Sequence, residues 1–257
     1  MTEFNLRLKA SVDANKFRYG YPWIYSNEII SDRRTKSLVP GSFCKLVDYN
    51  KSPVCLVTVN PKSKIFARVM DYNLETIVDA YWLKDKISKA LAKRKEIFRD
   101  PFYRLVNAEA DELPGLIVDR FDNVIVMQPN AFWAENMSEI IANSIKEVCS
   151  IDVVIKNASG RSRRLEGLDD KNSVFFGDLP EAAISVPMNG AIYKADVHEG
   201  QKTGLFYDQR QNHKFVASLA SGKTVLDVKE INYSSVLASE QEILNANPRW
   251  LDVKHAI

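Results

Sequence analysis

Basic and aromatic side chains crowd the beginning of the chain. Arginine and lysine bind phosphates through charge-assisted hydrogen bonds, and aromatic rings stack on bases. The residues concerned are Arg7, Lys9, Lys16, Arg18, Tyr19, Tyr21, Trp23, Arg33 and Arg34. Together these residue types can hold an RNA strand, and we predict such a contact here. For Trp23, which follows Pro22, a core position is the alternative.

A second group of arginines lies in the middle of the chain. Arg161, Arg163 and Arg164 follow the flexible pair Ser159-Gly160. Three guanidinium groups in one loop form a second candidate contact for phosphates. A solvated arginine loop without RNA is the alternative.

The net charge of +2 conceals an uneven distribution. Residues 1–75 carry 12 Lys and Arg against 7 Asp and Glu, whereas residues 76–155 carry 10 against 13. A basic end joined to an acidic middle suggests a polyanionic partner for the N-terminal module. A solvated basic face is the other interpretation.

Neither a metal site nor a catalytic residue is predicted. The cysteines are odd in number, and neither they nor the histidines show close metal-ligand spacing. These residues are Cys44, Cys55, Cys149, His198, His213 and His255. Cys55 and Cys149 lie in apolar runs, which favours a role as small buried hydrophobes.

Short strands broken by turns predict a compact β-barrel over residues 1–75. The expected strands are Leu6–Lys9, Phe43–Val47, Val54–Val59 and Ile65–Val69. Residues 76–101 then switch to helical spacing and form a predicted linker helix. Its lysines are interpreted as the solvated side of the helix, with a nucleic-acid contact as the alternative.

Residues 102–197 predict a central α+β domain. Strands are expected on both sides of the turn Asp122-Asn123, and an amphipathic helix is expected over residues 132–148. Further strands are expected at Asp152–Lys156, Ser173–Phe176 and Ala191–Val197.

The apolar runs are far shorter than the ~20 residues of a membrane span. The start of the chain lacks the basic and apolar regions of a signal peptide. We therefore expect a cytoplasmic protein without membrane contact.

Three stretches are distinctive in combination. They are Tyr103–Phe121 (YRLVNAEADELPGLIVDRF), Glu199–Arg210 (EGQKTGLFYDQR) and Thr224–Asp227 (TVLD). In this order they resemble the RlmI-type large-subunit ribosomal RNA cytosine-C5 methyltransferases, which depend on S-adenosylmethionine (SAM). Tyr21–Glu28 is similar to the start of the RNA-binding PUA domain of that family. The resemblance runs from about Leu6 to Asp227.

The resemblance implies an α+β multi-domain protein that binds large-subunit rRNA. It consists of a PUA-like barrel, a central α+β domain and a Rossmann-like methyltransferase domain, whose start would be residues 198–228. The second stretch lies near the SAM site in the family, and Asp227 ends the first strand of the methyltransferase sheet. The implied cofactor-binding residues are Gln201, Lys202, Thr203, Asp208, Gln209, Arg210 and Asp227. A salt-bridged turn is the alternative for this segment.

The chain departs from the family after Asp227. The glycine pair that lets the backbone approach the cofactor is replaced by Lys229–Ser235, and only 30 residues follow Asp227. The acidic residue that would hold the cofactor ribose is absent, and the family places its catalytic cysteine later still. We expect a truncated chain that does not bind SAM or transfer methyl groups alone. Residues 229–257 are an unassigned tail, from a disrupted reading frame or a natural short form.

The predicted function is therefore RNA binding within a methyltransferase family. One alternative is a methyltransferase subunit that a partner chain completes, and another is a protein-interaction module without an RNA role. The strand Thr224–Asp227, without its neighbours, could also pair with a second chain.

Overall fold

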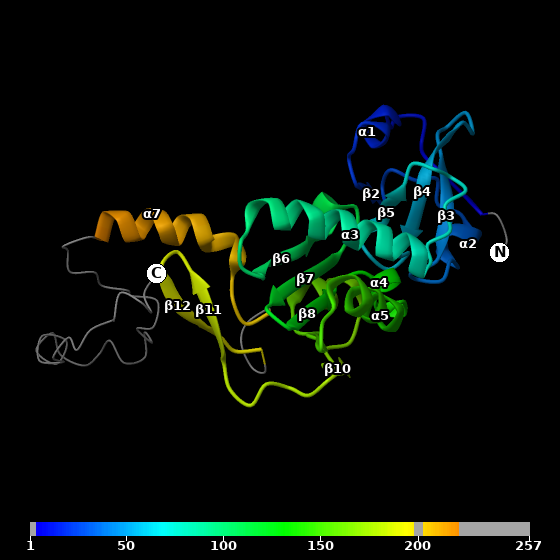
Figure 1. The fold of residues 1–257 in the computed structure, drawn as a ribbon. Coiled ribbons are helices and arrows are strands. Elements are labelled where there is room, and N and C mark those ends of the chain that lie inside the picture. Colours follow the sequence, from blue (N-terminus) through cyan, green and yellow to red (C-terminus); the bar gives the residue numbers. More distant parts are fainter. Residues whose placement is uncertain (1–3, 198–202, 221–257) are drawn as a thin grey trace, which may run out of the picture.

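The computed structural model describes residues 4–197 and 203–220. Within them the chain forms an N-terminal five-stranded sheet, a central five-stranded sheet and a two-stranded hairpin (Figure 1). In this part of the chain no helix is long and apolar enough to cross a membrane. The same residues contain no cluster of His, Cys, Asp or Glu that could hold a metal ion.

The N-terminal sheet is a half-barrel with the strand order β1-β3-β4-β5-β2. Strand β1 runs parallel to β3, and the other neighbouring strands are antiparallel. The elements are β1 (Asn5–Arg7), α1 (Asn15–Arg18), β2 (Trp23–Tyr25), α2 (Arg33–Lys36), β3 (Phe43–Val47), β4 (Pro53–Val59) and β5 (Ile65–Asp71). The strands that the sequence predicted after residue 40 are confirmed.

Helix α2 is fixed by a capping box. The Asp32 carboxylate accepts a hydrogen bond from the Thr35 amide at 2.7 Å, and the Thr35 hydroxyl accepts one from the Asp32 amide at 2.7 Å. Both partners satisfy amides at the helix start, which stabilises even so short a helix. Since Thr35 is buried, Arg33 and Arg34 are left on the outer side.

The linker helix is confirmed as α3 (Ala80–Ile97). It begins at Asp79, whose side chain accepts a hydrogen bond from the Trp82 amide at 2.9 Å. Leu83 and Ile87 lie on its buried face. The lysines Lys84, Lys86 and Lys89 form ion pairs with acidic side chains, which supports the interpretation of a solvated face.

The central sheet has the strand order β10-β9-β8-β7-β6, with β8 and β9 parallel. Helices α3, α4 and α5 cover one face, and the β11–β12 hairpin with Tyr207 packs against the other. Side chains alternate between the faces: Ile125 and Met127 face the helices, whereas Val124 and Val126 face the hairpin. The predicted hairpin turn is confirmed at Asp122, whose φ is +57°. The elements are β6 (Phe102–Asn107), β7 (Leu116–Phe121), β8 (Val124–Pro129), α4 (Phe132–Asn136), α5 (Ser138–Cys149), β9 (Val153–Lys156), α6 (Arg161–Glu166), β10 (Ser173–Phe176), β11 (Ile184–Met188), β12 (Ala191–Ala195) and α7 (Arg210–Ala220).

Several elements differ from the sequence predictions, and α1, β2, α2 and β6 were not predicted. The helix expected over residues 132–148 is two helices, α4 and α5, joined at Met137. Helix α6 was expected to be a loop, because its only aliphatic side chain, Leu165, is exposed and gives no apolar period. Strand β11 was missed because Pro187 lies within it. Helix α7 was not predicted.

A largely buried arginine side chain joins the N-terminal sheet to the central one. Arg68 of β5 forms ion pairs with Glu166 of α6 at 2.7 Å and with Glu109 at 3.2 Å. Glu166 also accepts hydrogen bonds from the Asn60 amide group at 2.7 Å and the Ser63 hydroxyl at 3.1 Å. One carboxylate thus holds three groups of the N-terminal sheet.

The two units also approach closely at Gly41. A Cβ there would lie 2.5 Å from the Asn136 amide nitrogen and 3.0 Å from the backbone of Phe132 in α4. The φ of +84° also favours glycine. The Pro40-Gly41 turn therefore seats the N-terminal sheet on α4.

We expect Arg68→Met to destabilise the protein by about 3 kcal/mol, because it leaves the buried carboxylate of Glu166 without its cation. Chemical denaturation measures this loss, with Arg34→Met as the control. Arg34 is exposed, so its replacement should change the free energy of unfolding by less than about 0.5 kcal/mol. Equal stability of the two variants would contradict a stabilising role for the Arg68 ion pairs.

Candidate RNA interface and cofactor segment

Three of the predicted RNA-binding cations of the N-terminal sheet have no internal partner among the described residues. Arg33 and Arg34 are exposed on α2, and Lys9 is exposed just after β1. Within the described residues none of their side chains forms a hydrogen bond or an ion pair. The Lys9 amide donates to the Glu28 carbonyl at 2.9 Å, so Lys9 lies beside the chain that leads into α2. These three cations can meet phosphates without first breaking an internal interaction.

Arg7 and Arg18 lie at the turn between β3 and β4. Arg7 donates to the Tyr49 carbonyl at 2.9 Å and stacks on the Tyr49 ring, 4.8 Å from its centre. Arg18 donates to the Pro53 carbonyl at 3.2 Å and lies 3.8 Å from the Asp48 carboxylate. Their charges therefore already hold this turn in place.

The aromatic residues divide between surface and junction. Tyr19 is 88% exposed, and Tyr21 is 39% exposed with the Lys16 ammonium 5.0 Å from its ring centre. Lys16 itself pairs with Glu28. The Trp23 indole donates to Glu109 at 2.8 Å, which makes it a half-buried junction residue. Trp23 therefore fits the structural alternative better than base stacking.

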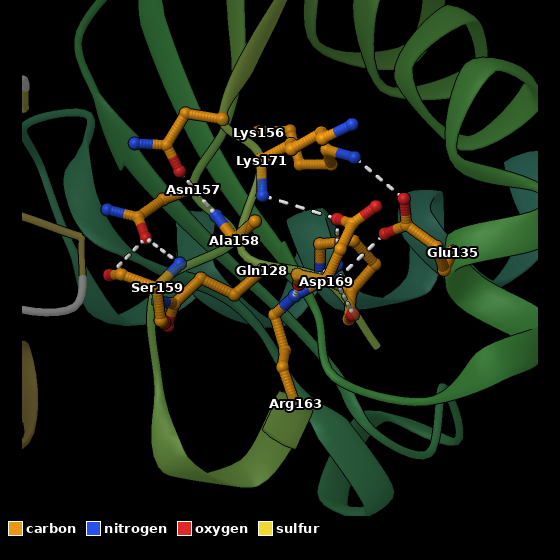
Figure 2. Close-up of polar contacts among 11 residues, drawn as sticks. Gln128, Glu135, Lys156, Asn157, Ala158, Ser159, Arg163, Asp169 and Lys171 are labelled. Atoms are coloured by element: carbon orange, nitrogen blue, oxygen red, sulfur yellow. Dashed lines mark hydrogen bonds and ion pairs between the residues drawn. The ribbon is translucent and has the colours of Figure 1, made fainter. Parts of the chain in front are cut away.

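Arg163 is fully buried and so is not available for the RNA contact that the sequence suggested. Its guanidinium group pairs with Glu135 at 2.8 Å and donates to the Pro129 carbonyl and, at 2.9 Å, to the Asp169 carbonyl (Figure 2). Lys156 binds the other oxygen of Glu135 at 2.7 Å. A residue with this many internal partners holds α6 to the central sheet.

The other two arginines of α6 point outward. Arg161 and Arg164 are exposed, and neither has a hydrogen-bond or ion-pair partner among the described residues. The loop before them is held by side chains: the Ser159 amide donates to Asn157 at 2.9 Å, and the Ala158 amide to Asn172 at 2.8 Å (Figure 2). The structure thus separates one structural arginine from two surface ones.

The predicted cofactor segment is described only in part. Gln201, Lys202 and Asp227 lie outside the described residues. The Thr203 hydroxyl donates to Asp119 at 2.6 Å, and Arg104 donates to the same carboxylate at 3.0 Å. Asp119 has no exposed surface, and burial raises its pKa against the opposing effect of these donors. These hydrogen bonds attach the segment to the central sheet.

Asp208, Gln209 and Arg210 follow at the start of α7. Arg210 donates to the Phe102 carbonyl, and its guanidinium group lies 4.6 Å from the centre of the Phe98 ring. Gln209 accepts from the Asn212 amide at 2.8 Å, and Asp208 is exposed. A cavity of about 310 Å³ adjoins Asp208 and Arg210. A role of these residues in SAM binding stays a prediction.

None of the cysteines is prepared for nucleophilic attack. Cys44, Cys55 and Cys149 are all buried. Burial raises the pKa of Cys44 and Cys55 to about 12 and that of Cys149 to about 11. Since the thiolate is the nucleophile, these thiols are inert at neutral pH.

The residues at the junction of the two sheets were not predicted from the sequence. Arg68 and Glu166 were not singled out, and neither were the exposed Lys62 and Lys64 on either side of Ser63. The only signal was the position of these two lysines in the turn after Asn60-Pro61. Nothing in the sequence pairs Arg68 with a carboxylate 98 residues away.

The fold and the exposed cations define an α+β protein whose N-terminal half-barrel is of the PUA-like class. Residues 6–72 match the family model of the PUA-like domain. A protein from Streptococcus mutans, assigned as a SAM-dependent methyltransferase, has a similar fold, with a TM-score of 0.68 at 14% identity. The match covers 83% of this chain and 54% of that one. A methyltransferase solved with SAH gives a TM-score of 0.67 at 15% identity, with 83% and 53% covered.

Proteins with similar sequences indicate a more specific family than the similar folds do. A ribosomal RNA large subunit methyltransferase of Deinococcus radiodurans is 31% identical over 86% of this chain and 56% of its own length. The ribosomal RNA large subunit methyltransferase I of Shewanella frigidimarina is 31% identical over 80% and 53%, respectively. The chain is thus a homologue of the ribosomal RNA large subunit methyltransferases and spans about half the length of these relatives. The family resemblance inferred from the sequence is confirmed.

We expect the native protein to resist thiol reagents at pH 8, because a pKa of about 11 or more leaves at most about one thiol in a thousand ionised. Labelling with a chromogenic disulfide should be at least about a hundredfold slower than in denaturant, where all three cysteines react. Rapid labelling of one native cysteine would instead identify an accessible thiolate that could act as a nucleophile, and would contradict this prediction.

Proposed function

We propose that this chain binds large-subunit ribosomal RNA through its PUA-like barrel. The observation that carries the proposal is that Lys9, Arg33 and Arg34 of that barrel are exposed and have no hydrogen bond or ion pair among the described residues. Homology to ribosomal RNA large subunit methyltransferases supports RNA as the polyanion. Exposed cations without internal partners and exposed tyrosine rings on the same barrel favour RNA binding over a protein-interaction module.

The barrel binds RNA through both charge and stacking. Each phosphate contact releases counterions, so the affinity must fall as salt rises. Tyr19 and Tyr21 offer exposed ring faces beside α1, where an unpaired base can stack. Stacking depends little on salt, and it therefore contributes affinity that remains when the phosphate contacts are screened.

We expect Arg33→Glu with Arg34→Glu to weaken binding to transcribed large-subunit rRNA at least tenfold and to lower its salt slope by about 2, one for each phosphate that is no longer bound. Fluorescence anisotropy at several salt concentrations measures both. Lys95→Glu with Lys214→Glu, two exposed helix positions outside the proposed interface, is the control. An unchanged slope would remove α2 from the interface, and binding insensitive to salt would contradict phosphate recognition altogether.

We propose further that these 257 residues do not transfer methyl groups by themselves. Residues 228–257 contain no glycine, so the bend that brings the backbone to a dinucleotide-like cofactor has no residue suited to it. The buried cysteines offer no thiolate for attack on a pyrimidine ring. RNA binding and methyl transfer are therefore separate properties, and we assign only the first to this chain.

Calorimetry with the 257-residue chain should detect no stoichiometric uptake of SAM, because neither the glycine bend nor the acid that holds the ribose is present after Asp227. The methyltransferase that was solved with SAH is the positive control. Tight one-to-one binding would disprove this proposal. Methyl incorporation into rRNA only after a second polypeptide is added would favour a subunit completed by a partner.

A further inference from the structure

Four exposed cations lie on the two segments by which the PUA-like barrel contacts the central domain. Two are Lys62 and Lys64, in the turn between β4 and β5, and two are Arg161 and Arg164, on α6. We call them the seam cations. The two pairs are about one hundred residues apart in the sequence, and only the folded structure brings them together.

Glu166 fixes the two pairs beside each other. Its carboxylate accepts from the Ser63 hydroxyl at 3.1 Å, and its backbone carbonyl accepts from the Asn60 side chain at 2.9 Å. Ser63 lies between the two lysines in the sequence, and Glu166 follows Arg164 by two residues. These hydrogen bonds therefore hold the turn that carries Lys62 and Lys64 against the C-terminal end of α6, the helix that carries Arg161 and Arg164.

Burial alternates so that every seam cation faces outward. Ser63 is buried, whereas Lys62 and Lys64 on either side of it are exposed. On α6, Arg163 and Glu166 lie three residues apart on the buried face, which leaves Arg161 and Arg164 outside. The structural roles at this junction are thus filled by other residues, and the seam cations are not needed for them.

The positive charge of the seam is not cancelled from within. None of the four side chains has a hydrogen bond or an ion pair in the described part of the chain. The acids beneath them are already paired, Glu166 with Arg68 and Glu135 with Arg163. Two acids beyond the end of α6, Asp169 and Asp170, are exposed and mark the limit of the basic surface on that side.

We propose that the seam cations bind the phosphate backbone of an RNA strand that passes from the barrel onto the central sheet. This inference rests on the proposed function and extends it, since it makes the barrel only one part of the interface. Phosphates fit the site because guanidinium and ammonium groups bind them without requiring a particular base. The Arg68–Glu166 ion pair holds the two segments in fixed relation, so little backbone conformational entropy is lost on binding.

The test compares Lys62→Glu with Arg164→Glu, the seam variant, against the wild type and the Lys95→Glu, Lys214→Glu control. The probe is transcribed large-subunit rRNA, and the readouts are affinity, salt slope and the length of RNA protected from nuclease. We expect the seam variant to bind at least tenfold more weakly, with a slope lower by about 2 and a shorter protected segment. The control should stay within about twofold of the wild type, as expected for cations outside the interface.

Lys62→Gln with Arg164→Gln separates the removal of positive charge from the repulsion that new carboxylates add. It should lower the slope by the same amount with a smaller reduction in affinity, because it removes the cations without adding anions. The positions substituted in the seam variants (Lys62 and Arg164) and in the control (Lys95 and Lys214) are exposed. Circular dichroism checks that each variant is folded.

The possible failures can be told apart. A seam variant that binds and protects RNA like the control, while Arg33→Glu with Arg34→Glu is weakened, overturns the seam and leaves the barrel proposal standing. Absence of salt-dependent binding in the wild type itself overturns both. Displacement of the rRNA by polyglutamate as effectively as by unlabelled rRNA would assign the seam to an acidic peptide and likewise overturn the inference.

Discussion

The pairing of Arg68 with Glu166 is the interaction on which the arrangement of this protein depends. An ion pair in which both side chains are largely buried contributes little net stability compared with apolar packing, but removal of one partner is costly. It therefore acts mainly by specifying position: the carboxylate is satisfied only when the β4–β5 turn lies against α6. The apolar core of the central sheet also includes Leu56 of β4 and Met70 of β5, so apolar packing brings the two sheets together and this polar interaction specifies their relative position.

The opposite face of the central sheet uses the same principle. Asp119 is buried among apolar side chains and is satisfied by Arg104 and by Thr203. Tyr207 adds a hydrogen bond to the Arg120 carbonyl at 2.9 Å and stacks on Phe121. The Asp119 carboxylate and the Tyr207 ring thus attach the described part of the largely polar segment Glu199–Arg210 to the central sheet through Thr203 and Tyr207. Both attachments join parts of the chain that are far apart in sequence.

Local order was largely predictable and these attachments were not. Strand β8 is a short apolar run after a turn and α3 carries an apolar stripe at helical period, so the local sequence pattern was sufficient for both. Helix α6 has no such period, because Arg163 and Glu166 form its buried face. Its burial depends on ion pairs with Glu135 and Arg68, which sequence spacing does not encode. The same reason explains why the candidate RNA interface was predicted only in part: Arg163 and Arg164 are neighbours with opposite roles.

Whether an arginine is paired inside the protein decides whether it can bind a polyanion. Arg68 would have to leave the buried carboxylate of Glu166 before meeting a phosphate, and that carboxylate would bear a desolvation cost of several kcal/mol. Arg163 is itself fully buried and would have to leave Glu135 and the Asp169 carbonyl. Arg33, Arg34 and Arg164 lose only water. A count of basic residues therefore overestimates an interface, whereas the subset without internal partners gives its physical extent. In this chain Lys9, Arg33 and Arg34 on the barrel and the seam cations along its junction with α6 belong to that subset, and we propose that a bound strand follows them.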